Sequence, residues 1–228
     1  MAHGLKKRRT GFREPRNWQY AIFSEGTVTE PAYFNGMRGV IEKTAAYKGM
    51  IYVEGTGSET QRVFEAAKAW VRDKKPRHCQ VWCLYDKDDF PADNFNNVLQ
   101  SIAALNQRSS DVTYHAGWSN ECFEYWLVLH FMMYTSDNGR DDYTQKLNEQ
   151  FHRMLHKAYS KKKEDCETLY QDMMSIGSLD VAIRNAKKQW ERLEGELGES
   201  TMQQCPAKAV PATTVHGLVE ELKRYMGE

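Results

Sequence analysis

Three aspartates directly follow an apolar run near the middle of the chain. Residues 81–89 read VWCLYDKDD, and Asp86, Asp88 and Asp89 close the segment. Aspartate is depleted in strands, so three of them at the end of a strand need another reason. In an open α/β sheet, ligands bind beyond the carboxyl ends of parallel strands, where these side chains would lie. Oxygen ligands without histidine or cysteine favour Mg²⁺, with Mn²⁺ as the alternative, so Asp86 and Asp88 are candidate ligands for metal-assisted phosphate chemistry. The competing interpretation is a solvated turn that caps the next helix.

The elements that would position these aspartates alternate between strand and helix. Short apolar runs predict strands at residues 20–23, 50–53 and 112–118, besides the run that ends in the aspartates. Apolar residues at helical spacing follow the first three strands, at residues 33–41, 63–71 and 94–106. Right-handed crossovers between such units give a mainly parallel sheet. We therefore predict an α/β fold with a four-stranded sheet flanked by helices.

The pattern changes after Ser119, where helix and loop replace the alternation. We expect helices at about residues 121–133, 143–156, 165–175, 179–197 and 215–225. The chain then divides into a basic arm over residues 1–17, an α/β domain over 18–120 and a helical extension over 121–228 packed on that domain.

Charge is unevenly distributed, although the 228 residues have a formal net charge of zero. The first sixteen residues contain six basic residues and one glutamate, a net charge of +5. Five cysteines without a disulfide-framework spacing, and no secretory signal, favour a reducing cytoplasm. The most apolar stretch is shorter than the roughly 20 residues that a membrane span needs, so we expect a cytoplasmic protein without a membrane partner.

Three glutamates are further candidates. Glu25 ends the first expected strand and could be a third metal ligand or the base that deprotonates a water, or only a turn residue facing water. Glu30 is expected to favour the start of a helix rather than to hold a second metal. Glu124 lies among large apolar residues, where an unpaired charge is costly, so a metal or a basic partner is expected. The alternative for Glu124 is a helix that merely packs on the sheet.

Other candidates would contact the nucleic acid. His130 could contact the scissile phosphate, although a histidine on an apolar helix is more often a core residue. The basic arm offers Lys6, Lys7, Arg8 and Arg9 to a phosphate backbone, and Lys87 is a further phosphate contact. Lys161 and Lys162 lie close to Tyr159, a basic and aromatic pattern that would suit nucleic acid or a solvated surface equally.

Four segments together resemble the RloB/AbiLii-like family of bacterial phage-defence proteins. They are EGTVTE at residues 25–30 with the following Tyr33-Phe34, YDKDD at 85–89, SNECFEYW at 119–126 with LHF at 129–131, and PATTVH at 211–216. The resemblance implies a Toprim-like domain with Mg²⁺, a catalytic glutamate matched by Glu25 and an Asp-x-Asp pair matched by Asp86 and Asp88. It also implies an ABC- or SMC-type ATPase partner, and this chain has no phosphate-binding loop of the G-x-x-x-x-G-K-[ST] type.

We therefore predict a Mg²⁺-dependent nuclease that cleaves RNA, tRNA or DNA in phage defence, with Glu124 as ligand of a second ion. One alternative is a regulatory subunit that senses a nucleotide or nucleic acid and is inert without its ATPase. Another is a structural binding module with a degenerate site. A homo-oligomer is compatible with each of these, and the sequence does not choose between DNA and RNA.

Overall fold

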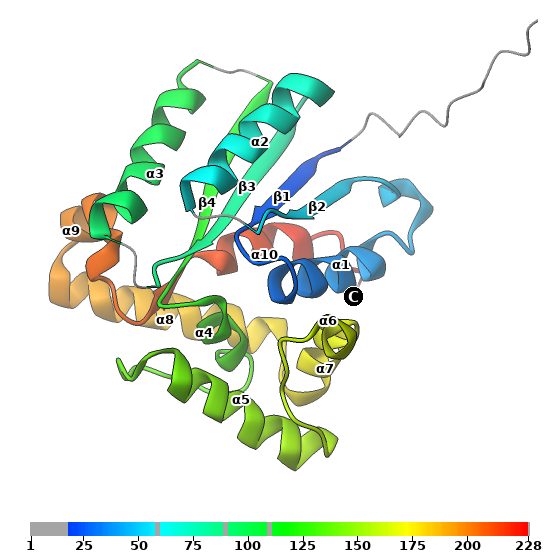
Figure 1. Ribbon diagram of the computed structural model, residues 1–228, viewed down its shortest axis with the longest axis vertical. Helices are drawn as coiled ribbons and strands as arrows, with labels where there is room; N and C mark the ends of the chain where they lie inside the picture. Colours follow the sequence, from blue (N-terminus) through cyan, green and yellow to red (C-terminus); the bar gives the residue numbers. More distant parts are fainter. Residues whose placement is uncertain (1–17, 58–59, 89–90, 109–110, 228) are drawn as a thin grey trace, which may run out of the picture.

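The computed structural model describes residues 18–57, 60–88, 91–108 and 111–227, and shows an α/β fold with a mostly parallel five-stranded sheet (Figure 1). The strands are β1 (Tyr20–Ser24), β2 (Ile51–Gly55), β3 (Cys79–Asp86), β4 (Val112–Asn120) and β5 (Ala212–Thr213). Their order in the sheet is β2-β1-β3-β4-β5. β1 to β4 are parallel and confirm the predicted strands, whereas β5 runs antiparallel to β4 and was not predicted.

Helices surround the sheet in the order α1 (Thr29–Ile41), α2 (Thr60–Lys74), α3 (Ala92–Asn106), α4 (Phe123–Val128), α5 (Gly139–Leu155), α6 (Lys163–Cys166), α7 (Leu169–Ile176), α8 (Leu179–Leu197), α9 (Glu199–Gln204) and α10 (Val215–Lys223). Two 3₁₀ turns lie at Ala45–Tyr47 and Pro206–Lys208. The dense apolar helix expected at residues 121–133 is shorter than predicted, because only α4 is helical there. The bounds of α8 match the prediction.

Alternation along the strands builds a core on each face of the sheet. In β1, Ala21 and Phe23 join a cluster with α2 and α3, whereas Tyr20 and Ile22 join a cluster with α1, α4 and α10. Successive side chains of a strand point to opposite faces, so a strand buried on both faces is apolar throughout. All five residues of β1 are accordingly buried.

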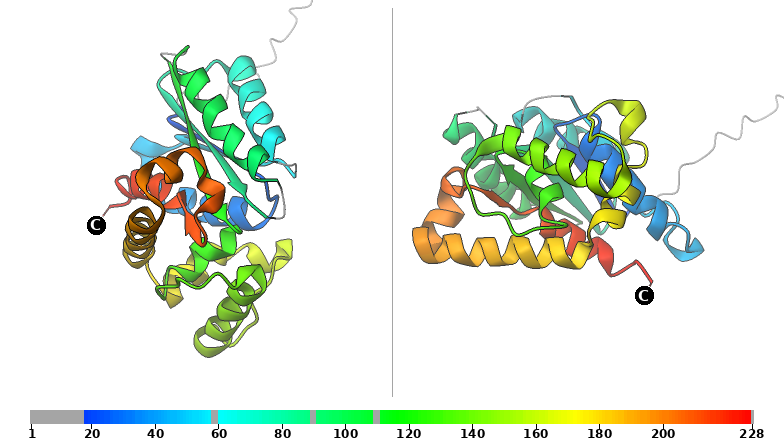
Figure 2. Two further views of the ribbon diagram at one scale, coloured as in Figure 1. Left: turned by 90° about the vertical axis from the view of Figure 1, so that its left-hand side faces the viewer. Right: turned by 90° about the horizontal axis from the view of Figure 1, so that it is seen from below.

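The helical extension shares its core with the α/β part. Ile22 of β1, Trp126 of α4 and Leu218 of α10 belong to one buried cluster. β5 then returns the chain to the sheet and pairs with Ser119 and Asn120 at the end of β4. Helices α4 to α7 lie beyond the carboxyl ends of the strands, which is the end that carries the candidate aspartates (Figures 1 and 2). In the part of the chain that the structure describes, no helix combines the length and apolarity needed to cross a membrane.

Candidate functional site

A cavity of about 300 Å³ lies where β1 and β3 end, and we call it the carboxylate cavity. The two strands are parallel neighbours with Ser24 opposite Leu84, and the N–H of Glu25 donates to the carbonyl of Leu84 at 3.0 Å. Their ends therefore open at the same edge. The cavity is lined by Glu25, Gly26, Thr27, Val28, Thr29, Glu30, Asp86, Asp88, Phe123, Glu124 and Lys161. The fold thus brings the four predicted metal ligands together and adds Glu30.

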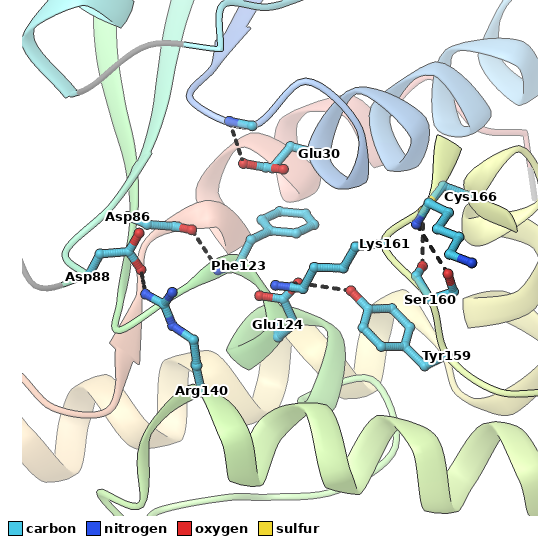
Figure 3. A network of polar contacts seen from close by, with 12 residues as sticks. Glu30, Asp86, Asp88, Phe123, Glu124, Arg140, Tyr159, Ser160, Lys161 and Cys166 are labelled. Atoms are coloured by element: carbon cyan, nitrogen blue, oxygen red, sulfur yellow. Dashed lines mark hydrogen bonds and ion pairs between the residues drawn. The ribbon is translucent and has the colours of Figure 1, made fainter. Parts of the chain in front are cut away.

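Asp86, the last residue of β3, connects the strand to a helix far along the chain. Its Oδ2 accepts a hydrogen bond from the N–H of Phe123 at 3.2 Å, so it satisfies an N–H at the start of α4 (Figure 3). Burial raises the pKa of Asp86 well above its ordinary value, and the charges of Glu30, Glu124 and Asp88 raise it further. An aspartate in these surroundings favours either a proton or a cation.

Glu30, in the first turn of α1, is 7 % exposed and is fixed by the turn that precedes it. Its Oε1 accepts from the N–H of Gly26 at 3.1 Å. A Cβ at position 26 would lie 2.3 Å from Oε2 of Glu30, so any larger residue there would require the Glu30 carboxylate to move. Burial raises the pKa of Glu30, and the charge of Glu124 adds to this effect. The sequence predicted only the helix-start role, and the structure adds the position inside the cavity.

Glu124 is 2 % exposed and already has a cation. Its Oε1 lies 2.7 Å from Nζ of Lys161 and accepts a hydrogen bond from the hydroxyl of Tyr159 at 2.9 Å (Figure 3). Burial by itself would raise the pKa of this carboxyl group, but Lys161, Cys122 and Tyr159 together hold the pKa below its usual value. The expected basic partner of Glu124 is therefore Lys161.

Asp88 also has a cationic partner, which α5 supplies. It forms an ion pair with Arg140, whose backbone N–H donates to Oε2 of Glu121 at 2.9 Å. Burial raises the pKa of Asp88, while the Arg140 guanidinium opposes that rise. Asp88 has a φ of 40°, in the left-handed region that aspartate tolerates better than most residues. Sequence patterns gave no signal for Arg140, because it approaches Asp88 only through the tertiary fold.

The remaining predicted contacts lie around or away from the cavity. Glu25 is half-buried on its lining, and Lys162 is exposed. Nζ of Lys87 donates to the carbonyl of Asp88 at 3.2 Å. Tyr159 is buried against Glu124, so its ring is not a surface on which a base could stack in this conformation. The predicted arm residues Lys6, Lys7, Arg8 and Arg9, and also Asp89, lie outside the described residues.

His130 lies in the core and is not among the residues that line the cavity. It is fully buried, its Nδ1 lies 3.0 Å from the carbonyl of Trp126, and its Nε2 lies 2.9 Å from the hydroxyl of Tyr33. Because a carbonyl only accepts, Nδ1 carries the proton, and Nε2 accepts from Tyr33. Burial lowers the pKa of His130 to about 4, so it is neutral at pH 7. The structure thus explains His130 as a core residue and gives no support to a phosphate contact.

The donor chemistry of the carboxylate cavity suits a hard divalent cation. Carboxylate oxygens are the ligands of Mg²⁺, and a cation beside Asp86 and Glu30 would lower the pKa of both. The side chains are not already arranged for this, because no group of three or more His, Cys, Asp or Glu among the described residues is disposed to hold a metal ion. Asp88 and Glu124 are instead engaged by Arg140 and Lys161. A metal ion could therefore bind in two ways. Either these ion pairs rearrange to free Asp88 and Glu124, or the ion is held by Asp86 and Glu30.

Comparison with known proteins identifies the family. A family model described as RloB-like protein matches residues 20–222, and the chain therefore belongs to this family. The match spans all five strands and the carboxylate cavity. No curated protein and no solved structure matches the chain.

Proposed function

Because the chain belongs to the RloB-like family and gathers five carboxylates in one cavity, we propose that it is a Mg²⁺-dependent nuclease acting on RNA, tRNA or DNA in phage defence. The observation that carries the proposal is the pair Asp86 and Glu30. Asp86 is half-buried at the end of β3, Glu30 is buried in the first turn of α1, and the pKa of each is raised by desolvation and by neighbouring negative charge. A bound cation would stabilise the charged form of such a pair. Clustered carboxylates are also the usual protein ligands in phosphoryl transfer sites.

The roles of the chain's own residues follow from their places in the cavity. Asp86 and Glu30 would hold the ion, and Asp88 would join them only after its ion pair with Arg140 opened. When bound, the ion would supply positive charge to the phosphate and make water more acidic. Glu25, half-buried at the lining, would take a proton from the attacking water. The oxygen of that water would then bond to phosphorus while the bond between phosphorus and the leaving oxygen breaks. Lys161, a cation on the same lining, would orient the phosphate.

The test compares two isosteric variants on a panel of DNA, total RNA and tRNA with Mg²⁺ or Mn²⁺. Asp86→Asn keeps an oxygen that can accept from Phe123 but removes the charge. Asp111→Asn makes the same change at an exposed position outside the cavity. We expect the first variant to lose cleavage by on the order of a thousandfold, as when a principal electrostatic group is removed, and the second to retain it. Metal-dependent cleavage retained by Asp86→Asn would reject this site.

The ion pairs of the cavity favour a second candidate function. Arg140 and Lys161 already neutralise Asp88 and Glu124, so the cavity could stay inactive until a partner displaces one of these cations. The family suggests an ABC- or SMC-type ATPase as that partner. In this case the pure chain cleaves nothing in the panel and cleaves only after the ATPase is added. If the chain is instead a structural module, Mg²⁺ should not raise its melting temperature, with or without the ATPase. A ligand raises the melting temperature only when it binds the folded protein.

A further inference from the structure

A second cavity, which we call the indole cavity, lies along the edge of the sheet between α8 and α10. Its volume is about 380 Å³, within the range of small-molecule sites. It is lined by Trp82, Ala116, Lys187, Trp190, Glu191, Thr214, His216 and Gly217. Among the described residues, none lines both this cavity and the carboxylate cavity. The two cavities are therefore separate features of the fold.

The cavity exists because β5 covers only the end of β4. β5 pairs with Ser119 and Asn120, and the Asn106 side chain occupies an earlier part of the same edge by bonding both the N–H and the carbonyl of Tyr114. The N–H of Trp118 donates to the hydroxyl of Thr214 on this edge. Alternate residues of a parallel strand direct their backbone groups to the same side, so Ala116, between Tyr114 and Trp118, also presents its N–H here.

Aromatic rings form the walls. Trp82 is held in place by a stacked contact with His115, with ring centroids 4.5 Å apart, and by a hydrogen bond from its indole N–H to Gln80. Trp190 is half-buried and its ring also contacts that of Trp118, with centroids 5.9 Å apart. A Cβ at Gly217 would come within 3.4 Å of Trp82, so glycine leaves this wall open. Rigid indoles on a half-open cavity are suited to a planar ring.

His216 supplies an acceptor beside these walls. Its Nδ1 lies 3.1 Å from the carbonyl of Thr213, and a carbonyl only accepts, so Nδ1 is protonated and Nε2 carries a lone pair. Burial lowers the pKa of His216, which keeps the ring neutral at pH 7. The cavity thus offers a hydrogen-bond acceptor at His216 and a donor at Ala116. Every nucleobase carries both donors and acceptors on its edges and a ring face that stacks on aromatic side chains.

We propose that the indole cavity binds a nucleobase, which either belongs to a free nucleotide or is an unstacked base of a single strand. Trp190 stacks on the base, and His216 and Ala116 bond its edge. Lys187, at the rim, is available to the phosphate because its ion pair with Glu220 joins two half-exposed side chains and is weak. This site is independent of the proposed cleavage and adds a second contact with nucleotides to the chain.

Binding is measured by titration calorimetry on the full chain with the four ribonucleoside monophosphates and with a single-stranded RNA oligonucleotide. Ribose 5-phosphate, which lacks a base, is the ligand control. His216→Phe keeps an aromatic ring but removes the acceptor, and Trp190→Ala removes one wall. His152→Phe makes the first change on an exposed face of α5. Circular dichroism and thermal melting establish that each variant is folded.

We expect His216→Phe and Trp190→Ala each to weaken binding by roughly tenfold, which matches the loss of one hydrogen bond or one stacked ring. His152→Phe should bind like the wild type, and ribose 5-phosphate should not bind. Affinity for a monophosphate assigns the site to free nucleotides. Affinity for the oligonucleotide alone, lost in His216→Phe, assigns it to a strand.

The proposal is overturned if no probe binds, if ribose 5-phosphate binds as well as the nucleotides, or if folded His216→Phe and Trp190→Ala bind like the wild type. Asp86→Asn separates this inference from the proposed function. It should abolish cleavage and leave base binding unchanged, so each proposal can fail without the other.

Discussion

Asp86, which is half-buried, and Glu124, which is buried, line the same cavity, and their pKa values move in opposite directions. Burial and neighbouring carboxylates raise the pKa of Asp86. Burial would also raise the pKa of Glu124, but Lys161 and Tyr159 bring that pKa below its usual value. Burial alone therefore does not decide the charge state of a carboxylate here. Glu124 combines an ion pair with hydrogen bonds from Cys122 and Tyr159, whereas at Asp88 the effect of Arg140 does not overcome burial and the pKa stays raised.

Ion pairing divides the carboxylates of the cavity into two groups, which we call the strand wall and the helical wall. The strand wall consists of Asp86 and Glu30, for which the structure records no ion pair among the described residues. The helical wall consists of Glu124 and Asp88 with their cations Lys161 and Arg140. We infer that the strand wall is the part prepared for an external cation, and that the helical wall is already neutralised within the fold.

The largest change in stability should come from removing the cation of the helical wall. Lys161→Met keeps an unbranched side chain that ends where the ammonium group would begin, but it leaves Glu124 buried without a counter-ion. Because Lys161 is about half-exposed, we expect a loss of roughly 2 kcal/mol in the free energy of unfolding at pH 7, measured by urea denaturation. The pKa of Glu124 should rise as well.

Lys162→Met is the matched control for this change, since it removes a neighbouring lysine that is exposed and does not line the cavity. We expect it to alter stability by less than about 0.5 kcal/mol. Equal losses in the two variants would show that Lys161 does not stabilise Glu124, and the distinction between the walls would fail.

Of the strand wall, Asp86 was predictable because its signal is local. An apolar run that ends in Asp86 places that aspartate at the end of a buried strand, whichever neighbours the strand later acquires. The four parallel strands and α8 follow from similar short-range patterns. β5 was missed because two residues carry no recognisable period.

The ion pairs of the helical wall were not predictable in the same way, although Asp88 and Glu124 themselves were predicted as site residues. Arg140 lies 52 residues from Asp88 in the sequence, and no spacing rule joins them. Lys161 was predicted as a nucleic-acid contact from its basic neighbours, whereas the structure pairs it with Glu124. Glu30 was attributed to its helix start, since its place in the cavity depends on how the tertiary fold brings α1 beside the end of β3. The chemistry of single segments was therefore predicted better than the contacts between them.

A smaller effect of opposite sign should come from the strand wall. A carboxyl group whose pKa is raised in the folded state binds more protons there than in the unfolded chain. The stability contributed by protonated Asp86 is therefore present at low pH and falls as the pH rises through the pKa of the folded protein. Asp86→Asn removes this loss, so we expect the variant to be more stable than the wild type at pH 8 by roughly 1 kcal/mol.

The measurement is the free energy of unfolding of both proteins from pH 4 to pH 8 without divalent cations. The difference between them should grow with pH. The lowered pKa of Glu124 gives the wild type stability that is present above the ordinary glutamate pKa and lost as the pH falls. Glu124→Gln should therefore be less stable than the wild type at pH 8, and this difference should shrink as the pH falls. A difference between Asp86→Asn and the wild type that shrinks with rising pH would show that Asp86 is not strained by its charge.

The smallest effect should come from a change at Tyr159. This change tests whether the charge of Glu124 is stabilised mainly by Lys161 or mainly by hydrogen bonds. Tyr159→Phe keeps the buried ring and its contact with Phe151 but removes the hydroxyl that donates to Glu124. We expect a loss of roughly 0.5–1 kcal/mol in urea denaturation, the usual net value of one hydrogen bond, and a smaller loss than in Lys161→Met. If Tyr159→Phe costs as much as Lys161→Met, then the hydroxyl stabilises the charge of Glu124 as strongly as the ammonium group does. Glu124 would then owe its lowered pKa to hydrogen bonding as much as to the ion pair.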